Sequence, residues 1–382
     1  MQHDYDIIIV GGNIVGATLA CALADSGLKL LVIDGYKPEP IDWPNNSYGD
    51  SYDLRVSALT RTSSELLEKL GIWQNLIKER PSPFRALHVW NKDVDNTLTF
   101  DSADTGDAYL GHIVENRRVQ QALHQALAYR RSVEVKLGTS LETLIVEKNK
   151  ATITTSNKKT LTAKLIVGAD GARSKVRELS NIQVTEWSYQ QQGIVANVKI
   201  EKPHRQYGWQ RFLKTGPLAF LPLDDGRSSI VWSAKDHYAN ELMAMDKVTF
   251  ESEITNAFQN ELGQVILDSE RAAFPLNAQH ANNYVAPRIA LIGDAAHSIH
   301  PLAGQGVNLG LLDASSLAKI IETALESKRD IGHEHTLKKY QRARKTSNLS
   351  MLAATDGLNK LFSNNNDLLN WARNAGFVAV NK

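Results

Sequence analysis

A glycine-rich turn near the start of the chain constrains the fold more than any other feature. The apolar run Asp6–Val10 is typical of a strand, Gly11-Gly12-Asn13-Ile14-Val15-Gly16 follows it at once, and the Ala-rich segment Ile14–Ala24 is typical of a helix. Such a turn needs residues without bulk, so that backbone N–H groups and the positive helix end can approach a pyrophosphate. Asp34 ends the next apolar run, where its carboxylate can hold a ribose hydroxyl. This context predicts a dinucleotide-binding unit.

Three more segments have the composition of strands from the same sheet. Lys29–Ile33, Lys164–Ala169 and Arg288–Ile292 are short, apolar and β-branched, as parallel strands covered on both faces are. The segment Thr62-Ser63-Ser64-Glu65 has the pattern of a capping box, and Gly71 the position of a helix end. Further apolar helix faces are formed by Val119, Leu123, Ala126 and Leu127, and by Leu309, Leu312, Leu317, Ile320 and Ile321.

The pattern changes between about residues 187 and 236. Alternating, aromatic-rich runs there predict antiparallel strands. Because nucleotide-type motifs lie on both sides of these runs, a second domain would interrupt the first. The aromatic residues at strand spacing are expected to be packing residues of this sheet, and one or two of them could line a ring pocket; they are Trp209, Phe212, Phe220 and Trp232.

Two further motifs follow predicted strands. In Val167–Arg177 an acid and a glycine, Asp170 and Gly171, come directly after a strand, a pattern that a plain strand-end turn would also give. The stretch Gly293–Gly310 is more specific. Asp294 can accept from a ribityl hydroxyl, and the turn Gly304-Gln305-Gly306 directs free N–H groups of the next helix at whatever lies above it. Such donors could stabilise negative charge on a reduced flavin ring.

Composition restricts the class of partner. The 43 Lys and Arg residues nearly equal the 42 Asp and Glu residues, and no block of like charge stands out, so a nucleic-acid surface has no support. The single cysteine, Cys21, excludes an internal disulfide framework and is expected to be a small buried hydrophobe. We see neither a signal peptide nor an apolar run that could span a bilayer. We expect a cytoplasmic protein, with peripheral contact at the inner membrane as an open alternative.

These motifs resemble those of the FAD-dependent aromatic hydroxylases with the para-hydroxybenzoate hydroxylase fold, and more narrowly the ubiquinone-biosynthesis hydroxylases. The resemblance runs from Asp6 to about Asn348. It rests on Arg55-Val56-Ser57-Ala58-Leu59, Gly111-His112-Ile113-Val114-Glu115-Asn116, Asp170-Gly171-Ala172-Arg173-Ser174 and His300-Pro301-Leu302-Ala303-Gly304-Gln305-Gly306-Val307-Asn308-Leu309-Gly310. The last of these stretches is close to diagnostic.

The resemblance implies an α/β fold in which a Rossmann-like FAD-binding domain carries an inserted antiparallel-sheet substrate domain and C-terminal helices. The FAD-binding domain would comprise 1–75, 106–182 and 275–348, the substrate domain 76–105 and 183–274, and the C-terminal helical segment 349–382. The resemblance puts Arg55 and Arg117 in contact with FAD and Gln120 near its pyrophosphate. Asp170 and Gly171 would belong to a motif that serves both FAD and NAD(P)H. The residues along the ribityl chain and ring of FAD would be Gly293, Asp294, Pro301, Gly304, Gln305, Gly306, Val307 and Asn308.

Two departures limit this transfer. Asn13 stands where the second glycine of the phosphate turn is expected, and its side chain would narrow the approach of the phosphate. The chain ends at Lys382, whereas relatives usually continue with a further stretch that could matter for membrane contact or assembly.

The function implied by the resemblance is hydroxylation of a polyprenyl phenol or benzoquinol of the ubiquinone pathway. NAD(P)H would reduce FAD, O2 would form a C4a-hydroperoxide, and its distal oxygen would pass to the aromatic ring. Local similarity favours 2-polyprenyl-3-methyl-6-methoxy-1,4-benzoquinol as substrate, with 2-polyprenylphenol as the runner-up. No residue is assigned as the catalytic base, and His300 and Pro301 are candidates at the flavin edge. A complex with other proteins of the pathway is a further expectation.

Several alternatives stay open at this point. The pair His297 and His300 has a spacing found in metal sites, although no third ligand is apparent and no metal is expected. A soluble aromatic compound could replace the prenylated substrate. Outside the class, a prenyl-lipid carrier without flavin chemistry and an NAD-dependent dehydrogenase share the same nucleotide-binding framework.

Overall fold

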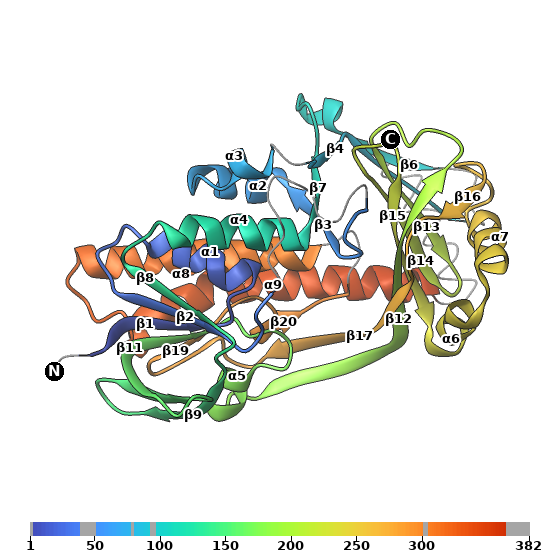
Figure 1. The fold of residues 1–382 in the computed structure, drawn as a ribbon. Helices are drawn as coiled ribbons and strands as arrows, with labels where there is room; N and C mark the ends of the chain where they lie inside the picture. The colour runs from blue at the N-terminus through green and yellow to red at the C-terminus, as the bar shows by residue number, and fades with distance from the viewer. Residues whose placement is uncertain (1–2, 39–50, 78–79, 92–96, 301–304, 364–382) are drawn as a thin grey trace.

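Three sheets organise the part of the chain that the computed structural model describes, residues 3–38, 51–77, 80–91, 97–300 and 305–363 (Figure 1). The first sheet has the strand order β18-β19-β11-β1-β2-β8, with β10 and β9 attached beside β11. Its strands are β1 (Tyr5–Val10), β2 (Leu30–Asp34), β8 (Val133–Leu137), β9 (Leu141–Val146), β10 (Ala151–Thr155), β11 (Thr160–Gly168), β18 (Val285–Ala286) and β19 (Ile289–Leu291). The pairs β1–β2, β1–β11, β2–β8 and β11–β19 are parallel, which confirms the predicted sheet.

Helices cover this sheet and bury its strands. Along one face lie α1 (Ile14–Leu23), α4 (Asn116–Ala128) and α8 (Gln305–Glu326), and α9 (Glu334–Ser363) packs along α8 (Figure 1). The short helix α5 (Lys175–Leu179) contacts β9. Cys21 is buried in α1, as expected from its Ala-rich surroundings. Among the described residues, no helix combines the length and hydropathy that crossing a bilayer requires.

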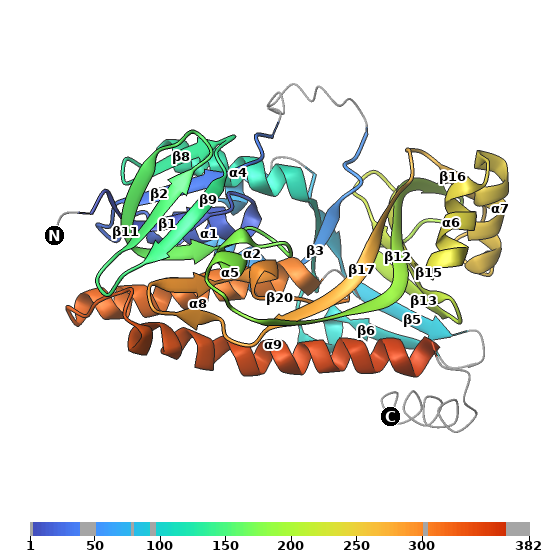
Figure 2. The ribbon, with the colours of Figure 1, turned by 90° about the horizontal axis from the view of Figure 1, so that it is seen from below.

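The second sheet is mostly antiparallel and is inserted into the first part of the fold. Its strands are β5 (Ala86–Asn91), β6 (Leu98–Asp101), β12 (Val184–Ile200), β13 (Tyr207–Leu213), β14 (Gly216–Pro222), β15 (Ser228–Lys235), β16 (Val265–Leu267), β17 (Ala272–Ala281) and β20 (His297–Ser298). The long strands β12 and β17 run from the first part of the molecule into this sheet (Figure 2). The predicted antiparallel insertion is therefore confirmed.

One face of the second sheet packs against α6 (Asp236–Ala244) and α7 (Lys247–Ala257). Phe220 and Trp232 belong to the apolar cluster under these helices, and Trp209 packs at its border, as predicted for packing residues. Phe212 alternates onto the opposite face of β13 and is buried there.

The third sheet is small and lies between the other two (Figure 1). It contains β3 (Val56–Thr60), β4 (Ser82–Phe84) and β7 (Gly111–Glu115), with α2 (Arg61–Lys69), α3 (Trp73–Leu76) and the 3-10 turn η1 (Ser102–Thr105) nearby. The predicted capping box at Thr62 is wrong by two residues. Thr60 caps α2 instead, because β3 stays extended up to this residue. The Thr60 hydroxyl accepts from the Ser63 N–H. Gly71 follows the helix with a left-handed φ of 75°, as its position predicts.

Three buried histidines are held neutral by their surroundings. His112 lies edge-on to Trp73 and Tyr109, with ring centroids 4.9 and 4.4 Å away. His280 bonds to the Tyr284 hydroxyl at 3.0 Å, and His300 is fully buried. Burial lowers the pKa of each of these three imidazoles from 6.5 to about 4.

This burial predicts a pH-dependent stability. Between about pH 6.5 and about pH 4 the unfolded chain binds protons at these histidines and the folded chain does not, so stability falls as the pH decreases through that window. Replacing His112 with Phe keeps an aromatic ring beside Trp73 and removes one titrating group. Urea unfolding at several pH values should then show a slope smaller by up to about 1.4 kcal/mol per pH unit. An unchanged slope would contradict the prediction.

Candidate functional site

The carboxyl ends of four strands meet at one edge of the first sheet. In the parallel register, Val10 lies beside Ile33 and Gly168, and Gly168 lies beside Leu291. The three glycine-bearing motifs lie at these strand ends: Gly11 follows Val10, Asp170 follows Gly168 by two residues, and Gly293 follows Leu291 by two residues. Open α/β sheets bind ligands at this edge. The register therefore places the three motifs side by side.

Contacts between α1 and α8 show that the first and third motifs converge. A Cβ built on Gly310 would lie 2.5 Å from the Val15 side chain, and one on Gly293 would lie 3.3 Å from it. Val15 is in the first turn of α1, so the start of α1 touches both ends of the third motif. One ligand can thus reach both helix starts.

The first motif has the close packing that requires glycine. Gly11 has a φ of 108°, and a Cβ there would lie 2.2 Å from the Ala169 carbonyl oxygen. A Cβ on Gly16 would lie 1.9 Å from the Gly11 carbonyl oxygen. The Gly12 N–H donates to the Asp34 carboxylate at 2.7 Å, so this acid holds the turn itself. A ribose contact of Asp34 stays a prediction.

Asn13 is the residue directly before the first turn of α1. Its φ is −78°, and it is the N-cap of α1, with its side-chain oxygen accepting from the Ile14 N–H at 2.7 Å. The Asn13 side chain therefore occupies the Ile14 N–H, which a glycine at this position would leave free for a phosphate. His124 of α4, which the sequence did not single out, bonds to the Gly12 carbonyl at 2.5 Å and supports the turn from the other side.

The acid of the second motif holds a helix start. Asp170 accepts from the Ser174 hydroxyl at 2.5 Å and from the Lys175 and Val176 N–H groups at 2.7 and 3.1 Å. Burial raises the pKa of this carboxyl, although these hydrogen bonds oppose the shift. A direct role of Asp170 and Gly171 toward FAD or NAD(P)H stays a prediction.

Arg177 connects the second motif to the third. Its buried guanidinium donates to the carbonyl oxygens of Ala295 at 2.9 Å and Ala172 at 2.8 Å. The two turns at the sheet edge are thus fixed relative to each other.

Asp294 is the polar group of the third motif that faces open space. Its carboxylate reaches solvent, and the described residues provide it with no hydrogen-bond donor. Protein surrounds it closely enough for desolvation to raise its pKa, while His297 and Arg55 oppose that shift. Arg55 therefore lies near enough to act on Asp294. This is the environment expected for a group that binds a polar ligand.

Within the described part of the chain, the start of α8 is uncrowded at Gly306. A Cβ built on Gly306 would have no described atom within 4 Å. Gln305 and Val307, on either side of it, are half-buried. The Asn308 amide instead holds the helix: its oxygen accepts from the Ser63 hydroxyl at 2.7 Å and its nitrogen donates to the Ala58 carbonyl at 2.8 Å. Pro301 and Gly304 lie outside the described residues.

The two predicted arginine contacts lie at the start of β3 and in α4. The Arg55 N–H donates to Asp53 at 3.2 Å, and its carbonyl accepts from the Asn116 N–H at 3.0 Å. Burial raises the pKa of Asp53, and both Arg117 and Arg55 oppose that shift. Gln120 is buried in α4. The charges of Arg55 and Arg117 thus both act on the Asp53 carboxylate.

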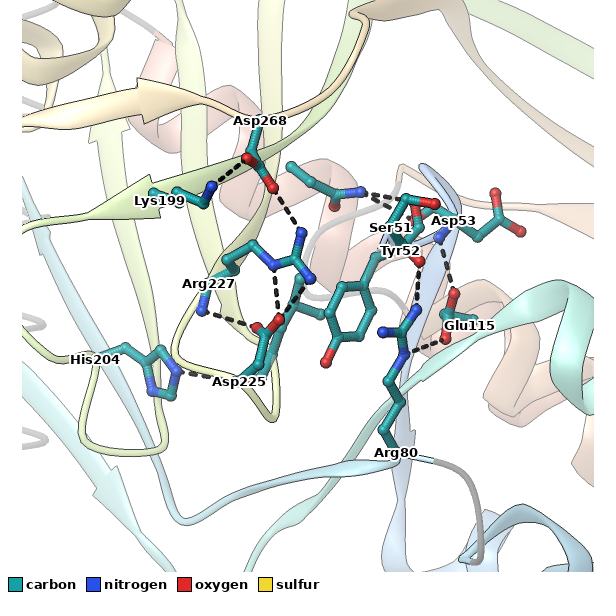
Figure 3. Close-up of polar contacts among 12 residues, drawn as sticks. Ser51, Tyr52, Asp53, Arg80, Glu115, Lys199, His204, Asp225, Arg227 and Asp268 are labelled. Atoms are coloured by element: carbon teal, nitrogen blue, oxygen red, sulfur yellow. Dashed lines mark hydrogen bonds and ion pairs between the residues drawn. The ribbon is translucent and has the colours of Figure 1, made fainter. Parts of the chain in front are cut away.

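A stacked cluster anchors the segment that leads to Arg55. Figure 3 shows the ring of Tyr52 between the guanidinium groups of Arg80 and Arg227, which lie 3.7 and 4.9 Å from the ring centroid. Glu115 accepts from the Asp53 N–H at 2.8 Å and pairs with Arg80 at 3.4 Å. Because Arg227 belongs to the second sheet's β14–β15 turn, the stack joins that sheet to the first part of the fold.

The two histidines of the third motif have different partners. His297 bonds to Asp313 at 2.5 Å, and His300 bonds to the Gln191 side chain at 3.2 Å and lies edge-on to Tyr189. Both contacts are to protein groups on different elements. The structure therefore gives each ring a separate bonding environment instead of turning both toward one point.

Known proteins share this arrangement. Residues 4–355 match the FAD binding domain family. The chain is 37% identical over 378 residues to the 3-demethoxyubiquinol 3-hydroxylase of Escherichia coli (strain K12), covering 99% of this chain and 95% of that protein. It is 37% identical to the ubiquinone hydroxylase UbiL of Rhodospirillum rubrum, covering 99% and 86%. PqsL of Pseudomonas aeruginosa, a probable FAD-dependent monooxygenase, shares the fold with a TM-score of 0.80 at 22% identity, covering 98% and 99%.

The family match, the curated relatives and the three converging motifs define an FAD-dependent monooxygenase. FAD fits what the residues provide: a glycine turn that a Cβ would fill, and an exposed acid at Asp294. Among the described residues, the Asp294 carboxylate has no hydrogen-bond donor and Gly306 has no atom in the place of a Cβ. Identity over nearly the whole length narrows the class further. The chain belongs to the ubiquinone-biosynthesis hydroxylase family of aromatic hydroxylases.

Replacing Asn13 with Gly should strengthen FAD binding. The change removes the side chain that occupies the Ile14 N–H, and glycine is a tolerated N-cap that costs only a few tenths of a kcal/mol. We expect the dissociation constant of FAD to fall by about tenfold, the lower end of the effect of one charge-assisted hydrogen bond. Titration of apoprotein with FAD, followed by flavin fluorescence, measures this. Asn13 replaced by Asp should weaken binding by charge repulsion; equal affinities for all three proteins would contradict the idea.

The stack around Tyr52 gives a prediction on stability. The Tyr52 hydroxyl is buried and has no hydrogen-bond partner among the described residues. Tyr52→Phe should therefore leave the free energy of unfolding within about 0.5 kcal/mol of wild type, or raise it slightly. Tyr52→Leu loses both arginine contacts and should cost about 1–3 kcal/mol. Urea unfolding compares the two variants, and equal losses for both would show that the ring is not the stabilising group.

Proposed function

We propose that this enzyme hydroxylates the ring of a prenylated benzoquinol, 2-polyprenyl-3-methyl-6-methoxy-1,4-benzoquinol. The observation that carries the proposal is the 37% identity, over 99% of this chain, to a protein named for hydroxylating a demethoxyubiquinol at position 3. The second relative, UbiL, is named only as a ubiquinone hydroxylase, which leaves 2-polyprenylphenol as the runner-up substrate.

The residues at the sheet edge would hold FAD along its length. Gly11, Gly12 and the start of α1 would receive the pyrophosphate, and Asp294 would accept from a ribityl hydroxyl. The start of α8 at Gly306 would face the ring. When bound, the flavin takes electrons from NAD(P)H and activates O2, chemistry that no side chain supplies.

The second sheet would contribute a dry wall to the substrate site. Ile194 and Trp232 pack under α6 and α7, so the alternating residues Val195 and Val231 face the other way. The apolar cluster on that side comprises Tyr52, Ala58, Ile113, Leu221 and Leu223, with Val56, Phe84 and Val231 packed against it. An apolar wall keeps water from the reacting atoms, and water would divert the activated oxygen to hydrogen peroxide.

His300 is the histidine beside the described end of the third motif. At neutral pH its ring is uncharged, because burial lowers its pKa to about 4. Its bond to Gln191 and its edge contact with Tyr189 fix the ring against β12. We assign it to holding the described end of the third motif against β12, in place of a charged role in proton transfer.

A polyprenyl tail would also require access from a lipid phase. Peripheral contact with a membrane, and a complex with other enzymes of the pathway, belong to the proposal on that chemical ground alone. Co-sedimentation with vesicles of anionic and neutral lipid tests the first of these.

Complementation decides the substrate and ring position together. The gene is introduced into bacterial strains that each lack one ring hydroxylase of ubiquinone synthesis, and the accumulating quinone intermediate is identified by mass spectrometry. We expect loss of the demethoxy intermediate and restored ubiquinone in the matching strain only. Asp294→Asn is the matched control, because it keeps the side-chain shape and loses the charge at the cofactor site. Rescue of the strain that accumulates polyprenylphenol would move the assignment to the runner-up.

Purified protein separates the enzyme from a prenyl-lipid carrier. The enzyme should be yellow, release FAD on denaturation, and consume NAD(P)H together with O2 when the quinol is added. A protein that binds the prenylated quinol and gives no oxygen uptake would support the carrier. Turnover of a soluble phenol at the same rate as the prenylated quinol would instead favour a substrate without a tail.

A further inference from the structure

A buried carboxylate behind the third motif has a full set of hydrogen-bond donors. Asp313 lies in the middle of α8 and is completely inaccessible to solvent. One of its oxygens accepts from the Gly293 N–H at 3.1 Å and from His297 Nε2 at 2.5 Å. The other accepts from Arg344 Nε at 2.8 Å and from Asn348 Nδ2 at 3.1 Å. One oxygen therefore binds the third motif, and the other binds α9.

The two partners of the first oxygen flank Asp294. Gly293 precedes it with a φ of 58°, and His297 follows it three residues later. The Ala296 N–H also donates to the Gly293 carbonyl at 2.8 Å, so the chain between them is a closed turn. A single carboxylate oxygen thus holds both ends of the turn from which the exposed Asp294 projects.

The charge of Asp313 is balanced from α9. Burial alone would raise its pKa, but His297 and Arg344 outweigh burial and keep the pKa below its usual value. Arg344 in turn donates to Asn348 at 2.8 Å, one turn further along α9. A buried carboxylate without such partners would be strongly destabilising, so the charge, its donors and the turn form one unit.

The network extends to the second sheet. Asn348 approaches the Tyr284 hydroxyl at 3.4 Å, and that hydroxyl bonds to His280 at 3.0 Å. The Tyr284 ring stacks on His297, with centroids 5.7 Å apart and an angle of 26°. His280 is the strand partner of His297 in the β17–β20 pair. The imidazole of His297 is therefore held on its edge by Asp313 and on its face by Tyr284.

We propose that Asp313 is a positioning residue for the flavin: it sets the place of Asp294, and with it the affinity for FAD, without touching the cofactor. The proposal concerns cofactor binding and does not depend on which aromatic compound is the substrate. It predicts that removing the charge of Asp313 acts on FAD through Asp294, in addition to any effect on folding.

The chain offers a matched control for that charge. Asp330 pairs with the buried Arg288, with contacts of 2.7 and 2.5 Å, at the start of β19, the end of the strand opposite the cofactor edge. Asp330→Asn and Asp313→Asn each remove one carboxylate that binds a buried arginine. Of these two residues, only Asp313 also binds the turn that carries Asp294.

The test is a titration of apoprotein with FAD, read by flavin fluorescence and by the visible absorption spectrum of the bound flavin. Asp313→Asn should weaken FAD binding about ten- to a hundredfold, the effect expected when the displaced Asp294 carboxylate loses its hydrogen bond to the cofactor. Asp330→Asn should lower the urea midpoint and leave FAD affinity unchanged. A loss of affinity of the same size in both variants would reduce Asp313 to a general stabilising residue and overturn the proposal.

A double-mutant cycle shows whether the effect passes through Asp294. If it does, Asp313→Asn should cost much less FAD affinity when Asp294 is already Asn, because the group it positions has lost its charge. Fully additive losses would overturn the proposal. Should Asp313→Asn fail to fold, Asn348→Ala removes only one donor of the cluster and decides the question with a smaller shift. Wild-type FAD affinity in that variant counts against the proposal.

Discussion

The register between four parallel strands is the constraint on which the rest of the structure depends. Val10, Ile33, Gly168 and Leu291 end at one edge because β1 pairs with both β2 and β11, and β11 pairs with β19. These residues come from segments far apart in the sequence, yet each is followed by a turn with its own glycine or acid. A shift of any strand by one residue would turn its buried side chains to the other face, so the register is strongly fixed.

Much of this arrangement could be predicted from the sequence because its determinants are local. Short apolar runs followed by glycine or aspartate mark strands whose ends bear ligand-binding turns, and Gly11, Gly16 and Asp294 lie where such patterns place them. Alternation and aromatic content marked the inserted sheet equally well. The start of α2 was misplaced by two residues, since both Thr60 and Thr62 have the chemistry of a cap and only the extent of β3 decides between them.

The residues that support the site were harder to predict because their partners are remote in sequence. Tyr52 stacks with arginines from two different parts of the fold, and His124 reaches the Gly12 carbonyl from α4. Asp313 had one usable signal, an acid on the buried side of an otherwise apolar helix. Asn13 shows the reverse case: its identity was noted, but its N-cap role depends on a backbone angle that residue type does not determine.

The pairing of β20 with β17 links the turn that carries Asp294 to the second sheet. His297 and Ser298 belong to the turn that carries Asp294, and they are also the edge strand of the large sheet. The turn that carries Asp294 and the second sheet are thus joined by strand pairing. A displacement of β17 would therefore also move the turn from which Asp294 projects, because the two are joined through the pairs His280–His297 and Gln279–Ser298.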